Sequence, residues 1–316
     1  MTDACLTVLG SINLDHVIRL PRFPAPGETL SGEDYLQVPG GKGANQAIAA
    51  VRMRQGQLPV NFIACLGQEA AGQALLDYFR AEGLNTDGIS SVSQATGVAL
   101  IYVNQQGENC IALHPGANQS LTAERVRQQQ ARLLASQLLL MQLESPIEAL
   151  IEAARIVKSA GGKVMLNPAP APAGALDPAL LALVDILTPN QHEASQLTGI
   201  EVTDAASAAE AAAHLHQAGV EQVIITLGSQ GLYASSRDTS QGQHYPAFVV
   251  EPLDTTAAGD TFNGALAIAL VEGNSLPEAL PLAQAAAAIS VTRAGAQTSI
   301  PRRAEVERQA QAHAWW

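Results

Sequence analysis

An eleven-residue segment near the C-terminus, Asp254–Gly264, combines small residues with an acid and leads into an apolar, helix-like run. The small residues Ala257, Ala258 and Gly259 would let a backbone turn approach a ligand closely. A helix starting there would direct free N–H groups and its positive dipole end at that ligand. Asp260 stands beside this anion site. An anion site next to a carboxylate base suits phosphoryl transfer to a hydroxyl; the alternative is an ordinary loop capped by Asp260.

A second polar turn, Gly-Gly-Lys-Gly-Ala-Asn-Gln at residues 40–46, opens a predicted helix that runs to about Met53. It is not a Walker A loop, because no Ser or Thr follows the lysine. It is not a dinucleotide fingerprint, because its glycines do not follow G-x-G-x-x-G. The first two glycines would let the backbone approach a small polar ligand, and Lys42 and Asn45 could donate hydrogen bonds to hydroxyls. A simple turn is the alternative.

Three further polar residues follow predicted strands. Asn13 and Asp15 share one face if the first strand stays extended, and an ionised Asp accepts hydrogen bonds from two adjacent sugar hydroxyls. Glu144 follows the apolar run 138–143. The carboxyl ends of strands are where open α/β sheets bind ligands. The alternatives are a common Asn-x-Asp turn and a helix cap beside Ser145.

Two segments further along are candidates for the nucleotide side. Asn190 and Glu193 have the spacing of a capping box, which is a sufficient structural explanation. The functional interpretation places both near phosphates, with Glu193 holding hydrated Mg²⁺ through water. Residues 226–231 contain two glycines that allow a tight turn and could leave space for a nucleotide; a plain hairpin is the alternative.

Short apolar runs that alternate with helix-like segments position these residues. Strands are predicted at 60–66, 138–143, 163–167, 185–188 and 222–227. Helices are predicted from Thr122, from a Ser145–Glu148 capping box and over 205–218. This alternation favours an α/β fold, doubly wound, with a mainly parallel sheet between helices. Segments at about 12–39 and 96–116, the latter a hairpin, are expected to form a small sheet that acts as a lid on a single domain spanning 1–316.

The composition excludes several classes of protein. Lys and Arg number 17 against 29 Asp and Glu, and the net charge of −12 argues against partners such as nucleic acid or an anionic membrane. No signal peptide and no stretch able to span a bilayer is expected. The three cysteines, Cys5, Cys65 and Cys110, are too few and scattered for a disulfide framework or zinc site, and are expected to be buried thiols in a reducing cytoplasm.

Together these segments resemble the ribokinase family of carbohydrate kinases over residues 5–301. Residues 40–46 are similar to the family's N-terminal signature and residues 254–264 to its C-terminal signature. The resemblance implies ATP-dependent phosphorylation of D-ribose at its 5-hydroxyl, giving D-ribose 5-phosphate and ADP. Asp260 would be the base, and the backbone of Ala257, Ala258 and Gly259 would form the anion hole.

The resemblance also implies a set of ligands for each substrate. Ribose would be held by Asn13, Asp15, Gly41, Lys42, Asn45, Glu144 and Asp260. ATP and Mg²⁺ would be held by Asn190, Glu193, Thr226, Gly228, Gly231, Gly259 and, near the adenine, Gln284. An activating K⁺ would be held by Asp254, Thr256, Val291, Ala294, Ala296 and Ser299. A homodimer through the lid sheets is expected.

Three other functions remain open at this point. A related kinase would act on 2-deoxyribose, fructose or a nucleoside. A non-catalytic sugar-binding regulator is disfavoured by the intact Asp260 and the anion loop around it. A dinucleotide-dependent oxidoreductase is disfavoured because no proper glycine fingerprint follows the first strand.

Overall fold

The computed structural model describes residues 5–172, 174–238 and 242–315 of the 316-residue chain. Its strands are β1 Leu6–Leu9, β2 Asn13–Arg19, β3 Tyr35–Gly40, β4 Val60–Gly67, β5 Asn85–Val92, β6 Gly97–Val103, β7 Asn109–His114, β8 Leu138–Met141, β9 Lys163–Leu166, β10 Ile186–Leu187, β11 Gln222–Thr226, β12 Leu232–Ser236 and β13 Gln243–Tyr245. Its helices are α1 Lys42–Met53, α2 Ala70–Glu82, α3 Ala123–Gln128, α4 Gln130–Leu134, α5 Ile147–Ser159, α6 Pro178–Leu181, α7 Gln191–Thr198, α8 Ala205–Gln217, α9 Ala258–Val271, α10 Leu276–Ser290 and α11 Arg303–His313, with short 3-10 turns at Gly116–Ser120 and Gly228–Gln230.

The larger sheet has nine strands in the order β13-β12-β11-β10-β9-β8-β1-β4-β5. Neighbouring strands from β11 to β5 pair in parallel, while β12 and β13 continue the sheet as an antiparallel edge. The strands are short apolar runs because both faces of a parallel sheet are covered. The predicted doubly wound, mainly parallel sheet is confirmed.

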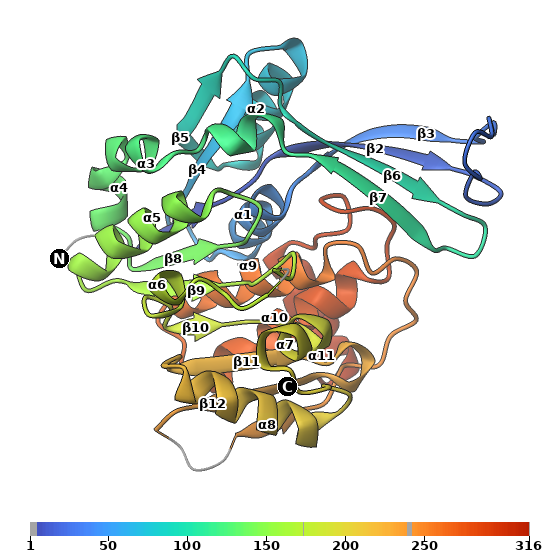
Figure 1. Cartoon of the computed structure of the whole chain (residues 1–316). Helices are drawn as coiled ribbons and strands as arrows, with labels where there is room; N and C mark the ends of the chain where they lie inside the picture. The colour runs from blue at the N-terminus through green and yellow to red at the C-terminus, as the bar shows by residue number, and fades with distance from the viewer. Residues whose placement is uncertain (1–4, 173, 239–241, 316) are drawn as a thin grey trace.

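Side chains alternate along each strand and enter two separate cores. In β8, Leu138 and Leu140 join one core, whereas Leu139 and Met141 join the other. Helices α1, α2, α9, α10 and α11 cover the first face, and α3 to α8 cover the second (Figure 1). The sheet therefore lies between two helical layers and brings the carboxyl ends of its parallel strands to one edge.

Helices α1 and α9 pack closely because one glycine permits it. A Cβ atom built at Gly264 of α9 would lie 2.4 Å from the carbonyl oxygen of Gln46 and 2.6 Å from the Cβ of Ala49, both on α1. Real Cβ contacts of this length do not occur, so only glycine fits here. The first turns of the two helices are held side by side as a result.

A second sheet of four strands, in the order β3-β2-β6-β7, projects from the main body (Figure 1). β2 pairs antiparallel with β3 and parallel with β6, and β6 forms an antiparallel hairpin with β7. We call these four strands the lid sheet. They come mainly from the segments at about 12–39 and 96–116, which do not follow the alternating pattern of strands and helices.

Two local predictions are wrong. The α5 N-cap is Pro146, whose carbonyl accepts the N–H of Ala149 at 3.0 Å, so Ser145 lies one residue too early to cap the helix. The Ser145 hydroxyl is buried and has no hydrogen-bond partner among the described residues. Cys110 is exposed, because it lies on β7 at the edge of the lid sheet; Cys5 and Cys65 are buried as expected.

None of the helices in the described part of the chain is both long enough and apolar enough to cross a membrane.

Candidate active site

Asp260 lies in the first turn of α9, directly after an unusual backbone turn. Ala257, the N-cap residue, adopts a left-handed conformation with φ 59°. A non-glycine residue there stores strain that is most often found at functional sites. Gly259 is exposed, and a Cβ built on it would meet no atom within 4 Å, so the space beside the first helical turn is open. The turn therefore presents the backbone of this helix N-terminus to open space.

The N–H groups of this turn are not equally free. The Ala258 N–H donates to the Thr255 carbonyl at 3.2 Å. The first N–H groups of a helix have no partner within the helix, so Gly259 and Asp260 can offer theirs to an anion. The Ala258 contribution to the predicted anion hole requires this long bond to give way.

The Asp260 carboxylate connects the two sequence motifs. Its side chain is 8% exposed. Its Oδ2 accepts a hydrogen bond from Asn45 Nδ2 and its Oδ1 one from Gln46 Nε2, both at 2.9 Å. Residues 40–46 and 254–264 thus meet, although more than two hundred positions separate them in sequence.

The proposed sugar ligands of the lid sheet lie beside this pair of motifs. Asn13 pairs with Gly40 in the β2–β3 ladder, and Asp15 follows on the same face. A Cβ at Gly40 would lie 2.0 Å from the Asp15 carboxylate, so the glycine makes room for that carboxylate. Asp15 Oδ1 is buried and has no hydrogen-bond partner among the described residues. An unpartnered buried carboxylate oxygen is an acceptor ready for a ligand hydroxyl.

Glu144 fixes the start of α1 from the opposite side. Its Oε2 accepts the Lys42 N–H at 3.0 Å and the hydroxyl of Ser11. Asn118 Nδ2 donates to the side-chain oxygen of Asn13 at 2.8 Å. Sequence reasoning missed Ser11 and Asn118, because a Ser after a strand and an Asn in a turn carry no signal of their own.

The charges of the site influence one another. Burial raises the pKa of Asp15 to about 7; the charges of Glu144 and Asp260 add to the rise, and Lys42 opposes it. Burial lowers the pKa of Lys42, but neighbouring carboxylates more than offset this and leave it raised; they belong to Asp260, Glu144, Glu193 and Asp15. Burial also raises the pKa of Glu193. Lys42 is therefore a shared counter-charge for the acids predicted to bind the sugar and for Glu193, which is predicted to lie on the nucleotide side.

The predicted nucleotide ligands lie at the ends of β10 and β11. Asn190 and Glu193 form a complete capping box at the start of α7, with both hydrogen bonds at 2.8 Å. Asn190 forms a parallel bridge with Thr226, so these two candidates are neighbours. The structural explanation of the capping box thus holds, and one Glu193 oxygen is already engaged by it.

Gly231 and Gln284 both contact the backbone at Tyr245 and Pro246. A Cβ at Gly231 would lie 2.0 Å from the carbonyl oxygen of Tyr245. Gln284 Nε2 donates to the carbonyls of Tyr245 and Pro246 at 3.4 and 3.2 Å. Gly231 is therefore required for chain packing, and Gln284 fixes the strand end beside it. Gly228, at φ 57°, begins the short 3-10 turn.

The residues predicted to bind a monovalent cation form one corner. Asp254 Oδ1 accepts the Thr256 N–H at 2.9 Å and its Oδ2 the Gly295 N–H at 2.8 Å. The Val291 carbonyl accepts two N–H groups, from Leu253 and Asp254, at 2.7 and 3.1 Å. The carbonyls of this corner and the Asp254 carboxylate are oxygen donors that suit a hard cation.

Three more oxygens of these residues already have partners. The Ser299 hydroxyl donates to the Ala296 carbonyl at 2.7 Å, and the Ala294 carbonyl accepts from Thr298 Oγ1 at 3.1 Å. A cation would therefore share or replace these bonds.

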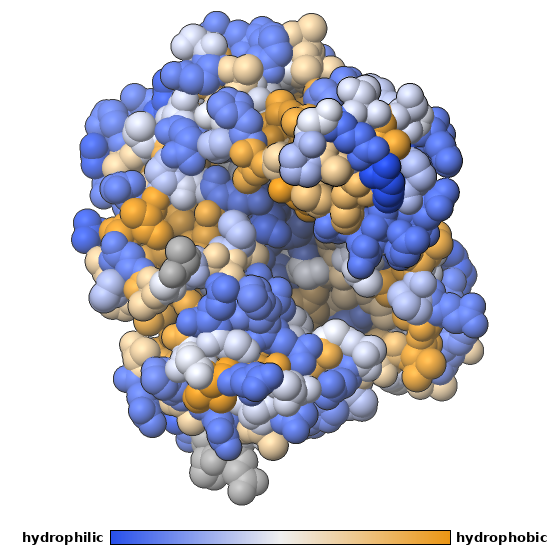
Figure 2. Space-filling model, turned by 45° about the vertical axis from the view of Figure 1, so that its right-hand side comes forward, coloured by the Kyte–Doolittle hydropathy of each residue, from blue (hydrophilic) through white to orange (hydrophobic). Residues whose placement is uncertain are grey.

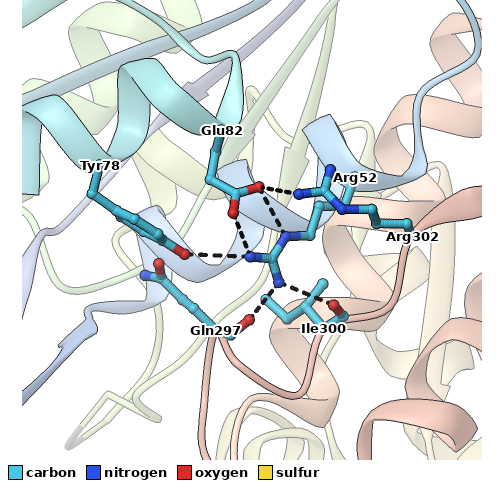
Figure 3. Close-up of polar contacts among 6 residues, drawn as sticks. All are labelled: Arg52, Tyr78, Glu82, Gln297, Ile300 and Arg302. Atoms are coloured by element: carbon cyan, nitrogen blue, oxygen red, sulfur yellow. Dashed lines mark hydrogen bonds and ion pairs between the residues drawn. The ribbon is translucent and has the colours of Figure 1, made fainter.

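An arginine clamp, formed by Arg52 and Glu82, holds the chain segment next to this corner (Figure 3). Arg52, at the end of α1, donates to the carbonyls of Gln297 and Ile300 at 2.5 and 3.0 Å. Glu82 of α2 accepts from Arg52 at 2.7 and 3.1 Å and from Arg302 at 3.1 Å. Gln297 Nε2 in turn donates to Asn45 Oδ1 at 3.0 Å. None of this was foreseen, since a helix arginine usually indicates a solvated surface.

The site opens into a hollow. Figure 2 shows it below the lid sheet, which comes forward in that view, and the atoms within it are mainly hydrophilic. Electrostatic interactions link five charged residues of the site, namely Asp15, Lys42, Glu144, Glu193 and Asp260. In addition, Glu144 accepts the backbone N–H of Lys42. The residues predicted to bind the sugar and the nucleotide thus lie near one another, between the lid sheet and the carboxyl ends of the strands of the large sheet.

Comparison with known proteins agrees with this arrangement. Residues 3–303 match the model of the pfkB family carbohydrate kinases. A ribokinase from Haemophilus influenzae is 50% identical over 95% of this chain and 96% of its own length, and one from Staphylococcus aureus is 40% identical over 95% and 98%. The crystal structure of a Thermotoga maritima ribokinase covers 97% of this chain and 99% of its own, with 38% identity and a TM-score of 0.88.

A structure of Arabidopsis thaliana ribokinase complexed with ribose and ATP covers 96% of this chain and 97% of its own, with 33% identity and a TM-score of 0.86. The match of sequence and fold extends over nearly the whole length of each relative. The chain belongs to the pfkB family of carbohydrate kinases.

Proposed function

We propose that the protein transfers the γ-phosphoryl group of ATP to the 5-hydroxyl of D-ribose in the cytoplasm, giving D-ribose 5-phosphate and ADP. One observation carries the proposal: the Asp260 carboxylate, at an open helix N-terminus, is hydrogen-bonded to Asn45 of the glycine-rich turn. Similarity to ribokinases, one of them solved with ribose and ATP, supports the choice of both substrates.

Asp260 acts as the base in this mechanism. The 5-hydroxyl oxygen attacks the γ-phosphorus, the bond to the departing ADP oxygen breaks, and Asp260 takes the hydroxyl proton. The N-terminus of α9, at Ala257, Ala258 and Gly259, faces the negative charge of the transferred group. The transition state is loose, so alignment and charge stabilisation account for most of the rate.

The sugar is held by groups that surround the start of α1. Asp15 offers its unpartnered oxygen to a vicinal diol, and Glu144 holds the backbone at Lys42 in place. The remaining proposed sugar ligands are Asn13, Gly41, Lys42 and Asn45. A grip on two neighbouring hydroxyls favours ribose over 2-deoxyribose, because the deoxy sugar leaves a buried acceptor unsatisfied.

The nucleotide occupies the side formed by Asn190, Thr226, Gly228 and Gly231, with Gln284 near the base. Mg²⁺ bound to the ATP phosphates would neutralise the charge that develops on them. Glu193 would hold this ion through water with the oxygen that the capping box leaves free. Mg²⁺ keeps several waters in such sites, so a single nearby carboxylate fits it.

A coupled ADP-release assay tests the proposal directly. We expect D-ribose to give the highest kcat/KM in a panel with 2-deoxyribose, fructose and a nucleoside. A missing hydroxyl at a site built to hydrogen-bond it costs orders of magnitude in kcat/KM. A clear preference for another acceptor would establish the related kinase instead, and absence of ADP release with any acceptor would favour a non-catalytic sugar binder.

We also propose that K⁺ occupies the corner formed by Asp254, Thr256, Val291, Ala294, Ala296 and Ser299. Bound there, it would stabilise the turn that leads into Ala257. We expect a higher kcat with K⁺ than with Na⁺ in the same assay at fixed ionic strength, because the smaller Na⁺ needs a tighter oxygen cage. Equal rates in both salts would remove this ion site.

The lid sheet is proposed to close over the sugar and to pair with the lid of a second copy. Directly opposed residues on neighbouring strands share a face. Leu36 opposes Val17, which opposes Ile101, and Ile101 opposes Ile111. Leu36 and Ile111 are nevertheless 56% and 55% exposed. This apolar stripe lies on the face that carries Asp15, so pairing would cover it next to the sugar site.

We expect sedimentation to show a dimer at micromolar concentration. The double variant Leu36→Asp/Ile111→Asp should be a monomer, because it places charges in the apolar stripe. Val249→Asp is the matched control, since Val249 is 96% exposed but lies outside the lid sheet. A wild-type monomer would contradict the pairing, as would a double variant that stays dimeric.

A further inference from the structure

We propose that Gln46 is a positioning residue that aims the Asp260 carboxylate at the substrate hydroxyl, and that Gln142 and Asn167 fix the orientation of Gln46. This rests on the proposed role of Asp260 as the base. The inference gives a role in the reaction to a layer of buried amides behind the site.

Every polar atom of the Gln46 side chain has a partner. Its Nε2 donates to Asp260 Oδ1 at 2.9 Å and to Asn167 Oδ1 at 3.0 Å. Its Oε1 accepts from Gln142 Nε2 at 2.6 Å. Gln46 and Gln142 are both 0% exposed. A side chain held by three hydrogen bonds without access to water has one orientation only.

The ionised carboxylate sets the direction of all these bonds. A carboxylate only accepts, so the NH₂ groups of Asn45 and Gln46 must face Asp260. The oxygen of Gln46 is then left to accept from Gln142. Asn167, which accepts from Gln46, turns its own NH₂ to the Thr188 carbonyl at 3.0 Å. Flipping any one amide would place two donors or two acceptors against each other.

These amides lie at the carboxyl ends of central strands of the large sheet. Gln142 follows β8, Asn167 follows β9 and Thr188 follows β10, so three adjacent strand ends supply the support. Core strands are among the parts of a fold that open only at high free energy. The base is thereby tied to the sheet, although it lies in the first turn of a helix.

Gln46 and Asn45 bind different oxygens of the Asp260 carboxylate. Each carboxylate oxygen receives one amide hydrogen bond, Oδ2 from Asn45 and Oδ1 from Gln46. Two such bonds fix the plane of the carboxylate and leave further lone pairs for the substrate hydroxyl. Asn45 is also a proposed sugar ligand, whereas Gln46 is fully buried behind the carboxylate. Loss of Gln46 should therefore affect the chemical step and not sugar binding.

The main test replaces Gln46 with Leu and measures single-turnover phosphoryl transfer with D-ribose and ATP. We expect a rate about 10- to 100-fold lower, because misplacement of a reacting group by about 1 Å has effects of this size. The KM for ribose should stay within about threefold of wild type. Asn61→Leu is the matched control, because Asn61 is a buried amide bonded to Asn85 and Thr7 away from this site. It should leave the transfer rate unchanged.

A second variant, Gln46→Glu, keeps the shape of the side chain but replaces the amide donor with a carboxyl group. A carboxyl group against Asp260 disfavours ionisation of both, so the acidic limb of the rate-against-pH profile should move upward by about one pH unit or more. This variant also keeps the test decisive if Gln46→Leu does not fold. An unshifted limb in folded Gln46→Glu would overturn the proposal.

The Asp260→Ala background separates this inference from the proposed function. If Gln46 acts only through Asp260, adding Gln46→Leu to Asp260→Ala should lower the rate no further. A full additional loss in the double variant would overturn the inference, as would a folded Gln46→Leu enzyme with wild-type rate. If Asp260→Ala alone retained near-native activity, the proposed function itself would fail, and that result is distinct from either of these.

Discussion

Replacing Asp260 with Ala is expected to lower kcat about 10²- to 10⁴-fold, which is the usual contribution of a general base. The carboxylate is placed at the start of α9 and receives hydrogen bonds from Asn45 and Gln46. Ribose binding should survive, because Asp15 and the backbone around Lys42 remain. Steady-state kinetics gives kcat, and calorimetric titration with ribose gives the affinity.

The choice of alanine matters for this experiment. Asn at position 260 would place its NH₂ group against one of the two NH₂ groups that now face the carboxylate, and would rearrange the amides. Asp34→Ala is a suitable control, since Asp34 is an exposed acid in the loop between β2 and β3 of the lid sheet. Retention of near-native kcat by Asp260→Ala would exclude Asp260 as the base.

Replacing Asp15 with Asn is expected to stabilise the protein without ligand while weakening ribose binding. The pKa of Asp15 is raised from its ordinary 3.8 to about 7, so the folded protein keeps a proton on Asp15 that the unfolded chain releases. Stability therefore falls as pH rises from about 4 to 7, and the loss reaches about 4 kcal/mol above pH 7. Asn removes this loss, so the gain in Tm should be large at pH 8 and small near pH 5.

The same substitution removes a charge-assisted acceptor from the sugar. Such hydrogen bonds contribute about 1.5–3 kcal/mol, so the Kd for ribose should rise about 10- to 100-fold at pH 8. Thermal unfolding at the two pH values and ribose titration measure both effects. Asp34→Asn should change neither. An Asp15→Asn protein with lower Tm at pH 8 would contradict the account of a buried, unpartnered carboxylate.

Much of the fold was predictable because its strands carry local signals. Apolar runs such as 60–66 and 222–227 are strands because both sheet faces bury their side chains. The hairpin of β6 and β7 was visible from its alternation and its turn at Asn104–Gly107. The parallel pairing of β2 with β6 joins segments more than eighty residues apart, and no local pattern encodes it.

The ends of elements depend on single hydrogen bonds that sequence patterns do not fix. Ser145 has the spacing of a cap, but the backbone makes Pro146 the N-cap. Near the C-terminus, Trp315 had no explanation from sequence. It stacks on Phe248 with ring centroids 4.6 Å apart, which only the folded chain brings together.

The two motifs could be singled out from the sequence because glycines and acids at fixed spacing are uncommon. The structure brings the motifs together, and the role of each residue stays a prediction. The supporting amides could not be singled out in this way. Gln46 lies in a helix and Gln142 in an otherwise apolar run between Met141 and Leu143. An uncharged polar residue inside a buried run is a usable signal, because it must find a partner. The identity of that partner requires the tertiary structure.

The role of Gly264 affects how the site should be mapped by mutagenesis. The spacing between α1 and α9 depends on a missing methyl group, since a Cβ there would overlap the Gln46 carbonyl. Any side chain at this position would force the two helices apart. It would thereby move Asp260 on α9 away from Asn45 and Gln46 on α1. Truncating side chains one by one would pass over this determinant, because at Gly264 there is nothing to remove.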